Sequence, residues 1–176
     1  DGGWPFSTGG PSRLEPTSRV LRLLARFPRT PAVTTASEAG LSFVQARRQP
    51  DGLFGDDSPS LFGSVFAIAA LDAWSRLTTA DAIALSTALL SRQQQDGSWG
   101  GTSHVTAAVL TALRRLLTPN LTVAASDVAL AQASATEGEE VSVQVTVRNT
   151  GYAPVAPFLV RAYESNGLPF GAGTVV

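Results

Sequence analysis

The sequence predicts an α region followed by a separate β region: helical hairpins over residues 1–118 and antiparallel strands over residues 119–176. The first observation behind this fold class is a short Asp-Gly turn that occurs three times, at residues 1–4, 51–54 and 96–99. Self-similarity at a spacing of about 45–50 residues is typical of repeat architectures, in which no unit buries its apolar face alone. The second observation is the apolar period, which changes at the end of the first region from that of a helix to the alternation of a strand.

Each turn leads into a segment with the apolar period of a helix. The three segments align position by position, and each begins with Thr or Ser. They are residues 17–27, 64–74 and 106–116. In the first segment Val20, Leu24 and Phe27 fall on one face, opposite several arginines, which is the pattern of an amphipathic helix. We therefore predict a helix after every turn.

A second set of helices is predicted before the second and third turns. Thr35 with Glu38, and Thr78 with Asp81, have the spacing of a capping box, in which a hydroxyl and a carboxylate cap the free amides of a helix start. These helices are expected to run to about Arg48 and Gln94, where the glycine of the turn supplies the positive φ that ends each of them. Together the patterns predict five helices, arranged as two complete hairpins and one half.

After the last helix, which Pro119 stops, the sequence predicts antiparallel strands. Residues 141–147 place four valines on one side and polar residues on the other, the pattern of a half-buried antiparallel strand. Turns are predicted on either side of it, at residues 137–140 and 149–151. Further strands are predicted at residues 121–125, 127–131, 158–164 and 173–176.

Residues 93–99 read Gln-Gln-Gln-Asp-Gly-Ser-Trp, a full match to the pattern Gln-x-x-x-Gly-x-Trp. With the helices around it, this motif resembles the repeat signature of the squalene–hopene cyclase and terpene cyclase family, and of the related protein prenyltransferase β subunits. The resemblance covers nearly all of the helical region. Its other copies are imperfect, since Arg48 and Phe54 replace Gln and Trp in the second copy and the first keeps only Gly2 and Trp4.

The resemblance implies a fold in which helical hairpins curl into an α/α toroid, here incomplete. It also implies a structural role for the motif: the Gln packs on the Trp and hydrogen-bonds a neighbouring helix end, which ties the repeats together. A flat indole offers a large packing face, and a Gln amide can satisfy free amides or carbonyls. The motif positions in this chain are Gly2, Trp4, Arg48, Gly52, Phe54, Gln93, Gly97 and Trp99.

The β region resembles the CARDB group of bacterial immunoglobulin-like domains. Residues 120–123 and 137–151 are similar to the opening strands and the Asn-Thr-Gly turn of that group. A complete sandwich of this kind needs about seven strands over roughly 100 residues. The resemblance therefore implies an incomplete antiparallel Ig-like β-sandwich, in a protein that is extracellular or on the surface of a bacterium. Because the chain has no Met and opens inside a repeat turn, we expect a fragment.

Acidic residues near the second turn are the main candidates for chemistry. Cyclases of the family that the repeats resemble protonate a polyene with an Asp of an Asp-x-Asp-Asp motif, whereas residues 54–57 here read Phe-Gly-Asp-Asp and lack the first Asp. A catalytic role for Asp56 or Asp57 is one hypothesis. The favoured interpretation is that these acids are solvated and that Asp57 or Ser58 caps the helix that follows. With Asp51, these carboxylates could alternatively form a weak Ca²⁺ site, although the spacing fits no established calcium loop.

Composition narrows the classes of function. The chain has no Cys and a single His, His104, which excludes a zinc site of the prenyltransferase type, and we predict no cofactor. A net charge of −1 gives no reason to expect a nucleic-acid partner. The longest apolar run, residues 65–71, is too short to span a bilayer. The large aromatic residues are interpreted as core rather than as the lining of a carbocation pocket.

The sequence therefore favours a non-catalytic binding or structural scaffold, a fragment of a bacterial exported or surface protein with an unidentified protein or glycan partner. This interpretation rests on a repeat that lacks its catalytic motif and is joined to an Ig-like domain of adhesion type. The alternative is a fragment of an enzyme, a squalene–hopene-like terpene cyclase (an isomerase) whose catalytic repeats lie outside this chain.

Overall fold

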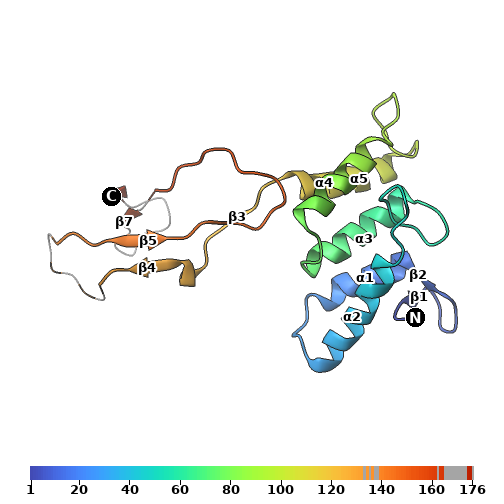
Figure 1. Cartoon of the computed structure of the whole chain (residues 1–176), viewed down its shortest axis with the longest axis horizontal. Coiled ribbons are helices and arrows are strands. Elements are labelled where there is room, and N and C mark those ends of the chain that lie inside the picture. The colour runs from blue at the N-terminus through green and yellow to red at the C-terminus, as the bar shows by residue number, and fades with distance from the viewer. Residues whose placement is uncertain (133, 135, 137–138, 162, 165–173, 176) are drawn as a thin grey trace.

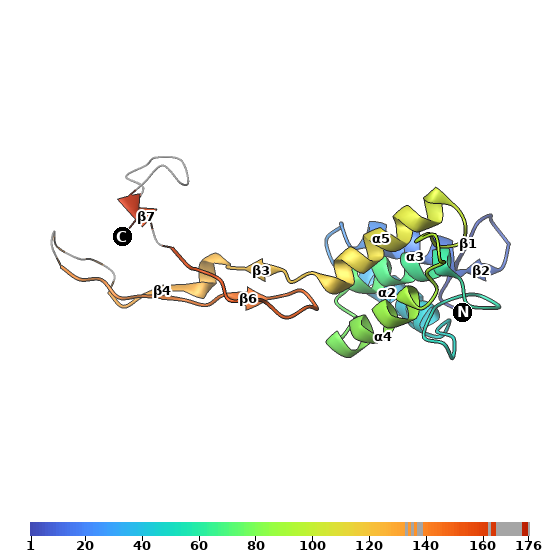
Figure 2. The same cartoon turned by 90° about the horizontal axis from the view of Figure 1, so that it is seen from above.

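The computed structural model describes residues 1–132, 134, 136, 139–161, 163–164 and 174–175. Within these residues the structure contains five α-helices and a few short antiparallel strands in small two-stranded sheets. The helices form one packed region, and the strands that follow residue 120 extend away from it in both views (Figure 1 and Figure 2). The chain is thus an α region joined to a small β region, as the change of apolar period predicts.

The helices lie close to their predicted positions. They are α1 (Leu14–Leu24), α2 (Pro31–Gln45), α3 (Leu61–Ala73), α4 (Thr79–Leu90) and α5 (Ser103–Leu117). Helix α3 packs between α1 and α5, while α2 packs against α1 and α4 against α5. The helices that follow the three turns therefore lie side by side. A short hairpin of β1 (Trp4–Pro5) and β2 (Ser12–Arg13) precedes α1.

One hydrophobic core runs through the helical region. Its fully buried aliphatic side chains come from all five helices and include Leu21, Val44, Ile68, Leu85, Leu89 and Val109. Burying each such side chain stabilises the fold by roughly 1.5–3 kcal/mol. Phe54, Trp74 and Trp99 belong to the same core, which confirms for these three the interpretation of the aromatic residues as packing groups.

The helix starts confirm one predicted capping box and correct the other. At α4 the Asp81 amide donates to Thr78 Oγ1 and the Thr78 amide donates to Asp81 Oδ2, both at 3.1 Å, which is the reciprocal pattern expected. The box predicted at Thr35 is wrong, because α2 begins one turn earlier with Thr30 as its cap and Pro31 at its first position. Proline at that position has no amide to leave unsatisfied and its φ already suits a helix, so it outweighs the later signal.

Two further details of the helices differ from prediction. The turn glycines have positive φ but do not end the helices, because α2 and α4 end at Gln45 and Leu90, several residues before Gly52 and Gly97. Phe27 lies beyond the end of α1 and is 53% exposed, so Leu21 rather than Phe27 anchors the buried face of that helix.

The β region consists of separate strand pairs. Strand β3 (Leu121–Thr122) pairs with β6 (Arg148–Asn149), β4 (Val128–Leu130) with β5 (Val143–Val145), and β7 (Tyr163–Glu164) with β8 (Thr174–Val175). All are antiparallel, as predicted.

The predicted strands of the β region are longer than the observed ones. A 3₁₀ turn (Ala125–Asp127) lies between the first two strands, and residues 158–161 form no strand. Three of the four valines of residues 141–147 are exposed and not half-buried as expected, because no second layer covers them within the described residues; Val143, for example, is 51% exposed. Val147 alone of the four is half-buried. Of the predicted turn at 137–140, residues 137 and 138 lie outside the described residues, and so do residues 162, 173 and 176 of the predicted strands at 158–164 and 173–176.

The β region is anchored to the helices at one joint. The Tyr152 hydroxyl donates to Asp72 Oδ1 of α3 at 2.9 Å, and Arg115 of α5 forms an ion pair with Asp72 Oδ2 at 2.8 Å. The predicted turn at 149–151 lies beside this contact. A Cβ on Gly151 would come within 2.5 Å of the Asn120 backbone nitrogen, so only glycine permits this close approach.

Candidate functional site

The three Asp-Gly turns share one local geometry. In each, the Asp carboxylate accepts a hydrogen bond from the amide two residues on: Asp1 from Gly3, Asp51 from Leu53 and Asp96 from Ser98, at 2.9–3.2 Å. The intervening glycines have φ of +81° to +86°, a region that L side chains rarely adopt. The Asp-Gly pair therefore builds the turn itself, and the carboxylate is occupied by the backbone.

A hydroxyl from the following helix clamps the aromatic residue of every turn. The amides of Trp4, Phe54 and Trp99 donate to the hydroxyls of Thr17, Ser64 and Thr106 at 2.8, 2.8 and 3.0 Å. Each hydroxyl lies within 3.3–3.4 Å of the carbonyl of the same aromatic residue. The clamp joins each turn to α1, α3 or α5. These hydroxyls are the first positions of the three aligned segments, so the alignment contained this signal although it predicted no role for them.

The third turn, the full motif match, uses its Trp to hold a helix end. Trp99 is 2% exposed, and its Nε1 donates to the Leu89 carbonyl of α4 at 2.7 Å. The Gln93 side chain donates to the Gly97 carbonyl within the same turn at 2.9 Å. The hydrogen bond to a helix end that the family resemblance implies for Gln is therefore made here by Trp99.

The second turn, with Arg48 and Phe54 at these positions, makes different contacts. Arg48 Nη1 pairs with Asp81 Oδ1 at 2.6 Å, so it reaches the capping residue of α4. Its guanidinium carbon lies 5.9 Å from the Phe54 ring centroid, within the range of a cation–π contact. The substituted motif thus still connects an aromatic residue with a neighbouring helix end.

The three carboxylates considered for chemistry do not converge. Asp56 caps α1 from across the fold, since its carboxylate accepts from the Leu14 amide at 3.0 and 3.2 Å, and it also pairs with Arg47. Asp57 is largely exposed and pairs with Arg13 at 3.3 Å. Asp51 pairs with Arg92 at 2.6 Å. Helix α3, which follows this turn, is capped by Ser60 and not by Asp57 or Ser58 as expected. Within the described residues, no group of three or more His, Cys, Asp or Glu side chains could hold a metal ion.

Arginine–carboxylate pairs join residues about one repeat apart. Five of them link side chains 33 to 44 residues apart in the sequence: Arg13–Asp57, Arg48–Asp81, Arg76–Glu38, Arg92–Asp51 and Arg115–Asp72. Exposed pairs of this kind are each worth only about 0–1 kcal/mol.

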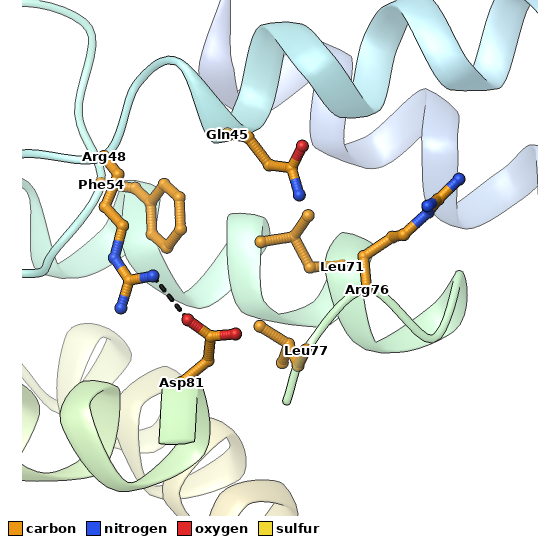
Figure 3. A pocket seen from close by; sticks show the side chains of 7 residues that line it. All are labelled: Gln45, Arg48, Phe54, Leu71, Arg76, Leu77 and Asp81. Atoms are coloured by element: carbon orange, nitrogen blue, oxygen red, sulfur yellow. Dashed lines mark hydrogen bonds and ion pairs between the residues drawn. The ribbon is translucent and has the colours of Figure 1, made fainter. Parts of the chain in front are cut away.

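A pocket opens between the end of α2, the end of α3 and the start of α4 (Figure 3). Its volume is about 240 Å³. Phe54 and Leu71 lie buried beneath it, and Leu77 is half-buried at its side. Polar groups complete the lining. The residues around the pocket are Gln45, Arg48, Phe54, Leu71, Arg76, Leu77 and Asp81.

The charges at this pocket are held in fixed positions. The Arg48 guanidinium, followed by the Thr78 hydroxyl, holds the pKa of Asp81 below its ordinary value, so Asp81 stays ionised at neutral pH. Arg76 pairs with Glu38 on the outer side. The arrangement combines an apolar floor with a pre-oriented guanidinium, and its one carboxylate, Asp81, is occupied by Arg48 and Thr78, which are features of a binding pocket.

Other sequence-based expectations are placed as follows. His104 is an exposed residue in the first turn of α5, with its ring 5.0 Å from that of Phe62. Gly2 and Trp4 lie in the first turn, where the indole is half-buried against the core. Among the described residues, none of the helices combines the length and apolar character needed to cross a membrane.

Comparison with known proteins adds no family assignment. No protein-family model, no curated protein and no solved structure matches this chain.

Proposed function

We propose that this chain is part of a non-catalytic scaffold that binds a protein or glycan partner. In this proposal the hairpins are a segment of an α/α toroid of the cyclase type, and the strands are the first part of an Ig-like sandwich of a bacterial exported or surface protein. The repeat motif and the CARDB-like turn described above are the basis of these two assignments.

The observation that carries the proposal is the pairing of carboxylates with arginines in the helical region. Asp51, Asp56 and Asp57 each face a different arginine, and Asp56 also caps a helix. A carboxylic acid strong enough to protonate a polyene must be buried beside other carboxylates that keep it protonated. Here each carboxylate is instead engaged by an arginine, and that of Asp56 also by a helix-start amide, which suits a framework.

The proposal is tested with the full chain on a glycan array and a peptide array, in parallel with an assay for conversion of polyprenyl substrates. Selective retention of a glycan or a peptide without turnover is the expected result. Conversion of a polyprenyl substrate, or an Asp-x-Asp-Asp motif in the full-length gene product together with its location at cytoplasmic membranes, would favour the cyclase alternative and overturn the scaffold.

A further inference from the structure

The pocket lies where the second turn departs from the repeat motif. In the third turn the Trp99 indole reaches back to the end of α4 and hydrogen-bonds the Leu89 carbonyl. In the second turn Phe54 has a smaller ring without an N–H, and the corresponding end of α2, at Gln45, borders the pocket instead. Arg48, in place of the motif's Gln, supplies the guanidinium at the same point.

The dimensions of the pocket restrict what it can hold. Sites for drug-sized ligands generally have volumes of about 300–1,000 Å³, whereas this pocket has about 240 Å³. It therefore suits a single aliphatic side chain, which would lie on Phe54, Leu71 and Leu77.

The charges restrict the ligand further. The lining has two arginines and one carboxylate, and each arginine already has one partner: Arg76 pairs with Glu38, and Arg48 with Asp81. Asp81 is also engaged by Thr78, so the candidate donors to a ligand are the remaining N–H groups of Arg48. The ion pair uses Nη1 of Arg48, and a guanidinium presents a planar fork of five N–H donors that matches a carboxylate. The Gln45 amide points toward Leu71 and adds a group that can pair with a peptide backbone (Figure 3).

We propose that this pocket binds the C-terminal aliphatic residue of a peptide, with the side chain on Phe54 and Leu71 and the free carboxylate on Arg48. The guanidinium carbon and the Phe54 ring centroid are 5.9 Å apart, so one residue that carries both a side chain and an α-carboxylate can reach both groups. Within a peptide, away from its C-terminus, two residues would be needed: one with an aliphatic side chain and one with an acidic side chain. This proposal rests on the proposed function and specifies its partner as a protein with an aliphatic C-terminus.

The experiment measures binding of a fluorescein-labelled peptide, Gly-Ser-Gly-Ser-Ala-Leu, to the full chain by fluorescence anisotropy. The same peptide with a C-terminal amide, and a version ending in Ser, are compared with it. We expect the free acid to bind about tenfold or more tightly than the amide, because a hydrogen bond to a charged group contributes that much discrimination. The Ser peptide is expected to bind more weakly than the Leu peptide.

Three variants test whether the peptide binds in this pocket. Arg48→Gln is expected to reduce the ratio between acid and amide to about one. Phe54→Trp, which restores the motif of the third turn and fills the space, is expected to weaken both peptides. Arg92→Gln removes a comparable ion pair outside the pocket, with Asp51, and should leave binding unchanged. Circular dichroism establishes that each variant is folded.

Equal binding of acid and amide, an acid–amide ratio unchanged in Arg48→Gln, or no peptide binding by the folded chain would each overturn the pocket assignment. A selective glycan on the array combined with no peptide binding would overturn it while leaving the scaffold proposal in place. Turnover of a polyprenyl substrate would overturn the scaffold proposal itself.

Discussion

The helical and β regions carry equally clear apolar patterns, yet only the helical region buries them. Leu21 and Ile68 are fully buried, whereas Leu130 and Val143 are 59% and 51% exposed. The difference lies in the number of layers. Each helix packs on others, while the strand pairs of the β region have no second layer within the described residues. An isolated two-stranded hairpin is marginally stable in water. An apolar period thus predicts which face can be buried and leaves open whether a partner layer is present.

The largest expected effect contrasts the two regions directly. Leu21→Ala should lower the free energy of unfolding of the helical region by about 2–5 kcal/mol, because it removes a fully buried side chain and leaves a cavity. Leu130→Ala should change it by no more than about 0.5 kcal/mol, because that side chain is exposed. Urea unfolding followed by circular dichroism measures both. A cost for Leu130→Ala comparable to that of Leu21→Ala would show that the β4–β5 pair is covered in solution.

The hydroxyl clamps are expected to have the next largest effect. Ser64→Ala removes the acceptor of the buried Phe54 amide and should cost about 1–3 kcal/mol, the penalty for an unsatisfied buried group. Thr111→Val is a suitable control, since its hydroxyl is exposed and bonds to the Ala107 carbonyl of its own helix. Urea midpoints that shift equally for both variants would show that the clamps contribute no more than a surface hydroxyl.

A smaller effect is expected from Asp81, which both caps α4 and pairs with Arg48. Asp81→Asn should cost about 0.5–2 kcal/mol at pH 7. Because the pKa of Asp81 is lowered in the folded state, its contribution is present above the ordinary value of 3.8 and is lost as the pH falls through the lowered value. The stability difference between wild type and variant should therefore shrink at low pH. A difference of the same size at pH 7 and about pH 2 would contradict this account.

The smallest effect is expected at the contact between the two regions, where Tyr152 meets Asp72. Burial, together with the Asp72 carboxylate, raises the pKa of Tyr152 above its ordinary value of 10.0. The neutral phenol therefore contributes stability that is complete below about pH 10 and is lost as the pH rises through the raised value. Absorbance at about 295 nm, where tyrosinate absorbs, should show one of the chain's two tyrosines ionising above the usual range, and Tyr152→Phe should remove that phase. Its persistence in the variant would place the raised pKa elsewhere.

Local signals predict much of the helical region. The Thr78 capping box and the repeat frame that aligns Thr17, Ser64 and Thr106 both correspond to observed hydrogen bonds. These features depend on residues close in sequence, or on a repeated pattern that can be compared with itself. The start of α2 is mispredicted because two cap signals compete and the proline decides between them.

Non-local features cannot be predicted in the same way. Asp56 caps a helix whose first residue, Leu14, lies 42 positions away, and no local pattern indicates that contact. The pocket is an intermediate case. Its two defining residues, Arg48 and Phe54, are recognisable as departures from the motif, but the space they border depends on where α3 and α4 end and begin. The β pattern predicts antiparallel pairing correctly and does not determine how far each strand extends.

The cap that Asp56 places on α1 has a consequence for how the array can be divided. The Arg13 side chain makes no capping hydrogen bond at the start of that helix, and the Leu14 amide relies on a carboxylate from the following unit. A shortened chain that ends before residue 56 would therefore expose the first turn of α1 and leave its amide without this partner. A single unit that contains α1 is therefore not self-sufficient at its helix start, and a duplicated or recombined unit keeps this cap only if the second turn comes with it.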